Sequence, residues 1–307
     1  MADTTTSEKR DVPYYNEMKK ANSGAYKEGQ KIFIGKSKYS AVSDDFLFIN
    51  HNNLIDTNNQ AKTLHIYGSK DDIPNVSEII GKFPNIEYLT ISRDLIPFDK
   101  INLDMVKSFR VHPCCDEDID ISDKSNLWLD EQILPNVEYF SSFNGQSASD
   151  FCGIRPDNLP NVKWIDCTIA NKKETLKAIQ NFKSVVALSV ENVGKQDIFS
   201  AFENRLKILH LSGRFAGFPM QKISSQTSLE VLVINSYKLE FDMRWLLSVN
   251  LKEIQLINCL KVINAEALLE MDNLKSLFVL NCKNALSSEL KLKLKDREFE
   301  YLDIDFT

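Results

Sequence analysis

The sequence predicts an α/β solenoid, in which a parallel sheet lines one face of a stacked array and short helices line the other. A short apolar phrase recurs along the chain at intervals of 20–31 residues. Each phrase alternates apolar and other residues, and segments with helical spacing follow several of them. A period of this length is typical of repeat arrays, whose neighbouring units share one continuous core. We therefore expect a single array of about eleven units over residues 61–307.

The recurring phrase is an apolar residue, two residues of any kind, an apolar residue, one of any kind, and an apolar residue. It is plainest at Leu251-Lys-Glu-Ile-Gln-Leu256 and at Leu274-Lys-Ser-Leu-Phe-Val279. The other phrases begin at Ala61, Ile86, Val106, Val137, Val162, Val185, Leu206, Leu229 and Phe299. Alternation of this kind has the period of a strand, so each phrase predicts one strand.

Helical spacing follows three of the clearer phrases. Leu268 and Met271 lie three residues apart after Asn264, which is a residue type that favours a helix N-cap. The corresponding apolar residues in two other units are Leu176, Ile179, Ile198, Phe199 and Phe202. Because helices are wider than strands, we expect a curved, horseshoe-like array whose strands line the concave side.

Two segments precede the first phrase. Residues 1–25 are polar, and we expect them to be mobile. In residues 26–60, two short apolar runs begin at Lys31 and Phe46 and are separated by a Ser-, Lys- and Asp-rich turn. They predict a β-hairpin that caps the first repeat, because a terminal repeat would otherwise expose its stacking face.

Composition fits a cytoplasmic protein. The hydrophobic fraction is 43%, which is ordinary for a soluble chain. The sequence has no apolar run near the ~20 residues that a membrane span requires, and its polar N-terminus does not resemble a secretory signal. We expect no membrane contact. We also expect the six cysteines to be reduced and structural, since no spacing among them is typical of a zinc site.

The charge is concentrated in one insert. The chain carries a net charge of −6, and the segment from Cys114 to Glu131 has seven acids and one base, so it sums to the same value. The rest is near neutral, which argues against nucleic acid as a partner. The insert is either a solvated loop or an electrostatic lure for a basic protein. A calcium loop is disfavoured because Ile121 and Leu127 stand where an EF-hand needs Gly and Glu.

The residues between the apolar positions of each phrase are expected on the concave surface. In the first half of the array they concentrate Tyr, Trp, His and Arg, the types that dominate interface hot spots. The candidate partner-binding residues on this face and in the acidic insert are His65, Tyr67, Tyr88, Arg110, His112, Tyr139, Phe143, Trp164, Asp166, Asp116, Glu117, Asp118, Asp120 and Asp123. The alternative is that these aromatic rings pack on one another, or beneath the irregular inserts at 112–135 and 143–160.

Catalysis has little support in the sequence. His65 and His112 are expected on one face with Asp166, but no nucleophile motif stands beside them. The sequence also has no glycine-rich phosphate loop. We therefore expect no enzymatic activity, no cofactor and no bound metal.

The phrases resemble the leucine-rich repeat family, and the resemblance covers roughly residues 61–307. In the last complete units, Cys259 followed by Val262, Ile263, Asn264, Ala267 and Leu268 resembles the cysteine-containing subtype. The resemblance implies an α/β solenoid that serves many binding roles. No F-box-like helix precedes the array, so the ubiquitin-adaptor role of many relatives is not expected.

These observations predict a protein-binding module. Its most concrete form is a cytoplasmic, immunity-type inhibitor whose acidic insert faces the basic cleft of a toxin enzyme. The alternatives are an adaptor that joins two proteins and, with less support, an enzyme that uses the concave-face histidines. The last strand, after Phe299, is expected to present an open edge, which a partner or a second copy would cover.

Overall fold

The structure is a computed structural model. It describes residues 10–23, 31–34, 46–49, 61–96, 99–112, 132–142, 148–149, 151, 153–283 and 285–304. Contacts divide the chain into two compact units. We call residues 20–168 and 177–185 the N-terminal unit, and residues 1–19, 169–176 and 186–307 the C-terminal unit. The sequence predicted one continuous array.

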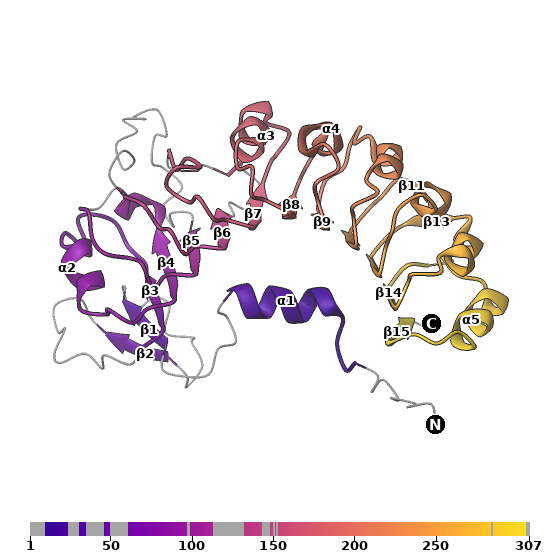
Figure 1. The fold of residues 1–307 in the computed structure, drawn as a ribbon, viewed down its shortest axis with the longest axis horizontal. Helices are drawn as coiled ribbons and strands as arrows, with labels where there is room; N and C mark the ends of the chain where they lie inside the picture. The colour runs from indigo at the N-terminus through magenta and orange to yellow at the C-terminus, as the bar shows by residue number, and fades with distance from the viewer. Residues whose placement is uncertain are drawn as a thin grey trace, which may run out of the picture. The chain divides into compact units, whose positions relative to one another are not determined.

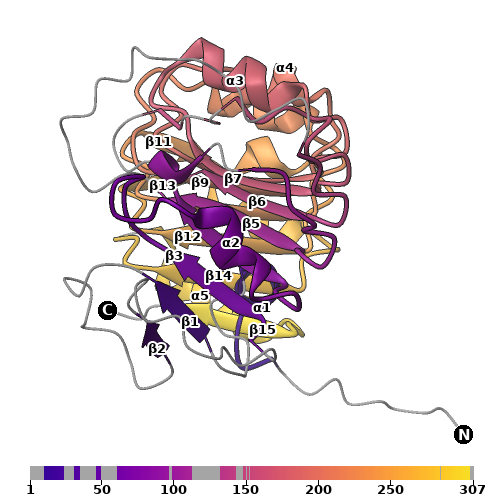
Figure 2. The same ribbon diagram turned by 90° about the vertical axis from the view of Figure 1, so that its left-hand side faces the viewer.

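The N-terminal unit is a parallel sheet in the order β2-β1-β3-β4-β5-β6-β7, and Figure 2 shows β3, β5, β6 and β7 one above another. Its elements are β1 (Lys31–Ile34), β2 (Phe46–Ile49), β3 (Thr63–Ile66), α2 (Val76–Gly81), β4 (Tyr88–Ser92), η3 (Arg93–Leu95), β5 (Ser108–His112), β6 (Tyr139–Ser142) and β7 (Trp164–Thr168).

The expected hairpin at the start of this sheet is wrong. Strand β1 pairs in parallel with both β2 and β3, whereas a hairpin requires antiparallel neighbours. Two apolar runs with a polar turn between them predict two strands, but they do not determine direction. A parallel connection needs a dozen or so residues, and the 11 residues between Ile34 and Phe46 come close to that length.

The C-terminal unit is a parallel sheet in the order β8-β9-β10-β12-β14-β15, with a second, two-stranded sheet of β11 and β13. Its elements are α1 (Tyr14–Ser23, of which residues 14–19 belong here), β8 (Ala187–Glu191), α4 (Ile198–Phe202), β9 (Ile208–Ser212), η4 (Met220–Ser225), β10 (Val231–Asn235), β11 (Glu240–Asp242), η5 (Met243–Leu246), β12 (Glu253–Ile257), β13 (Lys261–Ile263), η6 (Ala265–Glu270), β14 (Ser276–Leu280), α5 (Ser288–Lys295) and β15 (Tyr301–Ile304).

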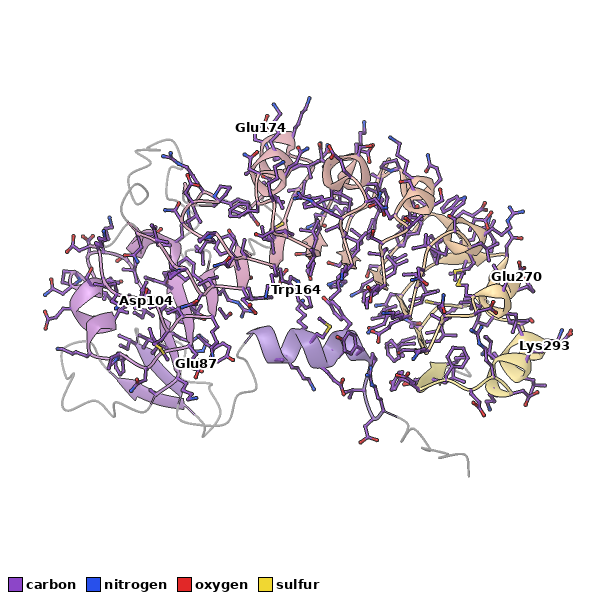
Figure 3. The ribbon with its side chains drawn as sticks, in the orientation of Figure 1. Glu87, Asp104, Trp164, Glu174, Glu270 and Lys293 are labelled. Atoms are coloured by element: carbon purple, nitrogen blue, oxygen red, sulfur yellow. The ribbon has the colours of Figure 1, made fainter. Side chains whose placement is uncertain are left out.

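Helix α3 (Lys173–Gln180) crosses the boundary between the units. In the C-terminal unit, Figure 1 shows the short helices on one side of the strands and α1 on the other. Figure 3 places Glu270 and Lys293 on the helix side of the same unit.

Each of the eleven predicted phrases forms one strand of these sheets, and almost all of its apolar positions are buried in the core. Adjacent strands pair residue for residue; Leu232, Ile254 and Leu277, for example, form one row across β10, β12 and β14. This repeated strand–helix geometry confirms the predicted α/β leucine-rich-repeat solenoid fold. Asn264 stands at the N-cap of η6, as predicted, but its backbone is left-handed (φ 52°) and its side chain accepts no capping hydrogen bond.

Asparagines connect successive turns of the C-terminal unit. The Asn281 amide donates to the Asn258 Oδ1 at 2.7 Å, and the Asn258 amide donates to the Asn235 Oδ1 at 3.3 Å. Asn258 and Asn281 both have positive φ, which asparagine tolerates better than most residues. Cys167 and Cys259 form no disulfide among the described residues, and burial raises the pKa of the Cys167 thiol, so it is not a reactive group.

Charged side chains at the second position of many phrases form ion pairs between neighbouring strands, and we call this series of ion pairs the charge ladder. In the N-terminal unit, Glu87 lies between Lys62 and Lys107, with N–O distances of 2.7 and 2.8 Å. Hydrogen bonds from both lysines hold the pKa of the Glu87 carboxyl below its usual value. In the C-terminal unit, Glu230 pairs with Lys252 and Glu300 pairs with Lys275. Such exposed pairs contribute little stability singly, but they keep this edge close to electrically neutral.

Leu256→Ala is expected to lower the free energy of unfolding of the C-terminal unit by about 2–5 kcal/mol, because Leu256 on β12 is fully buried. Leu280→Ala on the neighbouring strand is the matched control, since that side chain is 43% exposed. It should change the free energy by no more than about 0.5 kcal/mol. Equilibrium denaturation of the two variants checks this. Equal losses would contradict the assignment of Leu256 to the core.

Candidate functional site

The aromatic candidates of the N-terminal unit lie on the predicted strand positions, but three of them are not available to a partner. Tyr88, Tyr139 and Trp164 are only 7%, 1% and 3% exposed. A hot-spot side chain contributes binding free energy because it is desolvated when the partner binds, and these three rings are already desolvated in the folded chain. The strand alternation determines the side of the sheet from which a side chain projects. It does not determine what covers that side.

The buried rings form a packed polar cluster. The Tyr139 and Trp164 rings meet edge to face, with centroids 5.9 Å apart. The Tyr139 hydroxyl donates to the Asp166 carboxylate at 2.9 Å. Burial, and then the charge of Asp166, raise the pKa of Tyr139 well above its usual range. The sequence left open whether the aromatic rings bind a partner or pack on one another. Tyr139 and Trp164 pack on one another.

The remaining candidates on this face are half-exposed: His65, Tyr67, Arg110, His112 and Asp166. The Tyr67 ring stacks on His65 at 6.2 Å and meets the His112 ring edge to face at 4.9 Å. These three rings therefore form one aromatic group across β3 and β5. They remain candidates for partner binding.

The other predicted site residues lie outside the described part of the chain. They are Phe143 and the acids Asp116, Glu117, Asp118, Asp120 and Asp123. Their role in partner binding stays a prediction.

The strand face of the C-terminal unit holds a different kind of site, which is occupied by the chain's own N-terminal segment. We call residues 10–19 the N-terminal segment. Glu253, only 1% exposed, accepts the backbone N–H groups of Tyr14 and Tyr15 at 2.7 and 3.0 Å. It also accepts the side-chain amide of Gln255 at 2.7 Å. The first amides of a helix have no partner within the helix, and a carboxylate stabilises both these donors and the positive end of the helix dipole. The Glu253 carboxylate therefore binds the N-terminus of helix α1.

Tyr15 anchors the segment further along the same face. Its side chain is 3% exposed, and its hydroxyl lies 2.7 Å from His210 Nδ1 and 3.1 Å from the Ser189 hydroxyl. Burial, and then the nearby charge of Lys19, lower the pKa of His210 to about 3. The imidazole is therefore neutral at pH 7, and a neutral ring with its proton on Nε2 accepts the tyrosine proton at Nδ1.

The same segment also reaches the edge of the sheet that was expected to be open. The Arg10 N–H donates to the Glu300 carbonyl at 2.9 Å, just as the Glu300 N–H donates to Lys275 one strand earlier. Its guanidinium lies 3.9 Å from the Glu300 carboxylate, on the next rung of the charge ladder. The N-terminal segment thus occupies the Glu300 carbonyl, which directly precedes the edge strand β15.

Helix α1 corrects the expectation that residues 1–25 are a mobile polar segment, since residues 14–23 are helical. The sequence reasoning missed Tyr15 because it stands among polar residues, and it missed Glu253 because the phrase containing it was considered only for its apolar positions. A usable signal was present. Glu253 is the acid among the third residues of six phrases in this unit, where the others are Ala187, Ile208, Val231, Ser276 and Tyr301.

The described residues include no group of three or more His, Cys, Asp or Glu side chains that could hold a metal ion. None of the helices in the same described part is long and apolar enough to cross a bilayer.

Comparison with known proteins adds a likeness to solved structures. No family model and no curated protein matches this sequence. Among solved structures, the chain is similar to the plant peptide hormone receptor RGFR1 in complex with RGF2, with 14% identity and a TM-score of 0.37. The match covers 90% of this chain and 50% of that chain, so this chain spans half the length of its match. The assignment to an α/β leucine-rich-repeat solenoid therefore stands on the repeat geometry of the two sheets.

Proposed function

We propose that the protein is a non-catalytic protein-binding module, and that the strand face of its C-terminal unit is a binding surface. The docked N-terminal segment supports this proposal. The face receives a helical peptide through a buried carboxylate, a buried hydroxyl and a neutral imidazole, and it satisfies both backbone and side-chain groups of that peptide. A surface with these groups recognises polypeptide.

Site-specific photocrosslinking tests the proposal. Phe278 lies half-exposed on the strand face, and Leu292 is 62% exposed on α5. A photoreactive phenylalanine analogue is introduced at each position in the full chain, which is then irradiated with an extract of its source cells. We expect a discrete crosslinked protein from position 278 and none from position 292. Crosslinks from 292 alone would move the surface to the helix side, and none from either would contradict protein binding.

The finer form of the proposal is a cytoplasmic, immunity-type inhibitor of a basic toxin or effector enzyme. Its support is the sequence, in which seven acids and one base are concentrated between Cys114 and Glu131. Clustered charge of one sign accelerates association with an oppositely charged partner, and the effect is screened by salt.

Neutralising the cluster tests this form. The change replaces Asp116, Asp118, Asp120 and Asp123 by asparagine and Glu117 by glutamine. With the crosslinked partner in hand, we expect the association rate to fall by about tenfold or more and to lose most of its salt dependence. Stopped-flow kinetics at two ionic strengths provides the measurement. An unchanged rate would leave the insert as a solvated loop, and the binding module would stand without its basic partner.

A further inference from the structure

The N-terminal segment has the features of a ligand as well as those of a structural element. Only Pro13 and Tyr15 are buried within residues 10–19. A helix of this length is marginally stable alone in water, so α1 depends on the face that receives it.

The receiving face, in contrast, is built of buried polar groups. Glu253, Gln255 and Ser189 are each 1% exposed. Next to Glu253 in the sheet register stands Ser276, whose hydroxyl is buried and has no hydrogen-bond partner among the described residues. Buried polar groups without partners are costly. Without the segment, Glu253 would lose the N–H donors of Tyr14 and Tyr15, and Ser189 would lose the Tyr15 hydroxyl. The face is therefore suited to a polypeptide ligand that brings donors.

We propose that residues 10–19 are a displaceable intramolecular ligand that closes the strand face of the C-terminal unit, and that the partner binds there by presenting the same chemistry. That chemistry is a helix whose first free amides meet Glu253 and whose tyrosine reaches His210 and Ser189. This inference rests on the proposed function and adds to it the class of partner segment and a self-blocked state.

A tether explains why the closed state would dominate without a partner. A segment joined to the face by its own chain competes at an effective concentration of about millimolar. A partner segment therefore succeeds when it adds contacts elsewhere, or when the N-terminal segment is weakened. The second condition can be produced by mutation and forms the basis of the test.

The probe is a fluorescent synthetic peptide of residues 8–23, and the proteins are full-length chains. Tyr15→Ala removes the anchor of the tethered segment but leaves the face intact. We expect this variant to bind the peptide at least about tenfold more tightly than the wild-type chain. Glu17→Gln is the matched control, because the Glu17 side chain is exposed on the same helix; its peptide affinity should equal that of the wild type. Adding Glu253→Gln to Tyr15→Ala should lower the affinity again by about tenfold, since a neutral amide binds the helix end less well.

Fluorescence polarisation gives the affinities, and thermal melting of each variant confirms that it remains folded. Equal peptide binding by the wild type and Tyr15→Ala would overturn the inference, because the tethered segment would not be competing; the face would still bind helices, and the proposed function would stand. No binding by a folded Tyr15→Ala chain would overturn both.

Discussion

Replacing Trp164 by alanine is expected to lower the free energy of unfolding of the N-terminal unit by about 3–5 kcal/mol. The Trp164 side chain is 3% exposed and packs edge to face on Tyr139, so its removal leaves a cavity beside a ring whose hydroxyl is already bonded to Asp166. The loss combines the transfer free energy of the indole with the cost of that cavity. Urea denaturation followed by circular dichroism measures it.

Trp245→Ala in η5 is the matched control, because Trp245 is half-buried and meets only the Phe241 ring at 5.9 Å among the described aromatic contacts. It should cost clearly less than Trp164→Ala. The two variants also separate two interpretations of Trp164. Unchanged stability of Trp164→Ala together with weaker partner binding would contradict the assignment of Trp164 to the core.

Acidification is expected to release the N-terminal segment. The pKa of His210 is about 3 in the closed structure, against an ordinary value of about 6.5 for a free imidazole. The released state therefore binds more protons between these values. The closed state loses stability as the pH falls below about 6.5, and it is insensitive to this group above that value.

Among the described groups that face His210, the charge of Lys19 acts in the direction of release. On α1, Tyr15 contacts Nδ1, and the positive charge of Lys19 further disfavours a protonated ring. From the neighbouring strand β8, Ser189 is neutral and shares the Tyr15 hydroxyl. The slope is at most about 1.4 kcal/mol per pH unit. Because His210 keeps part of its surface in solvent, the observed slope should be smaller.

Amide hydrogen exchange of residues 14–19 at about pH 7.5 and about pH 5, on either side of the ordinary imidazole pKa, measures the effect after correction for the intrinsic pH dependence of exchange. Exchange should accelerate at the lower pH in the wild type. His210→Asn is the control, since its amide oxygen can take the place of Nδ1 as an acceptor and does not titrate. The variant should lose most of the acceleration. Equal acceleration in both chains would show that another group controls release.

Much of the fold was predictable because the core of a stacked array is encoded locally. Each phrase carries its own alternation, so its core positions needed no distant information: Ile254, Leu256 and Leu277 are core residues in the sequence and in the structure. The direction of the first two strands was not predictable in this way. Pairing is a relation between segments, and the composition of β1 and β2 is the same for a hairpin as for parallel neighbours.

The features of the site can also be divided into those that local sequence patterns predict and those that depend on contacts between distant residues. The repeat, the strand positions and the side of the sheet on which Tyr139, Trp164 and His210 stand follow from the sequence, because alternation is a property of consecutive residues. Which of those residues are covered, and by what, depends on contacts between distant segments of the folded chain. Tyr15 meets His210 across 195 positions of sequence, and Tyr14 meets Glu253 across 239. No local pattern predicts such contacts, because their free energy depends on groups that come together only after the sheet has formed.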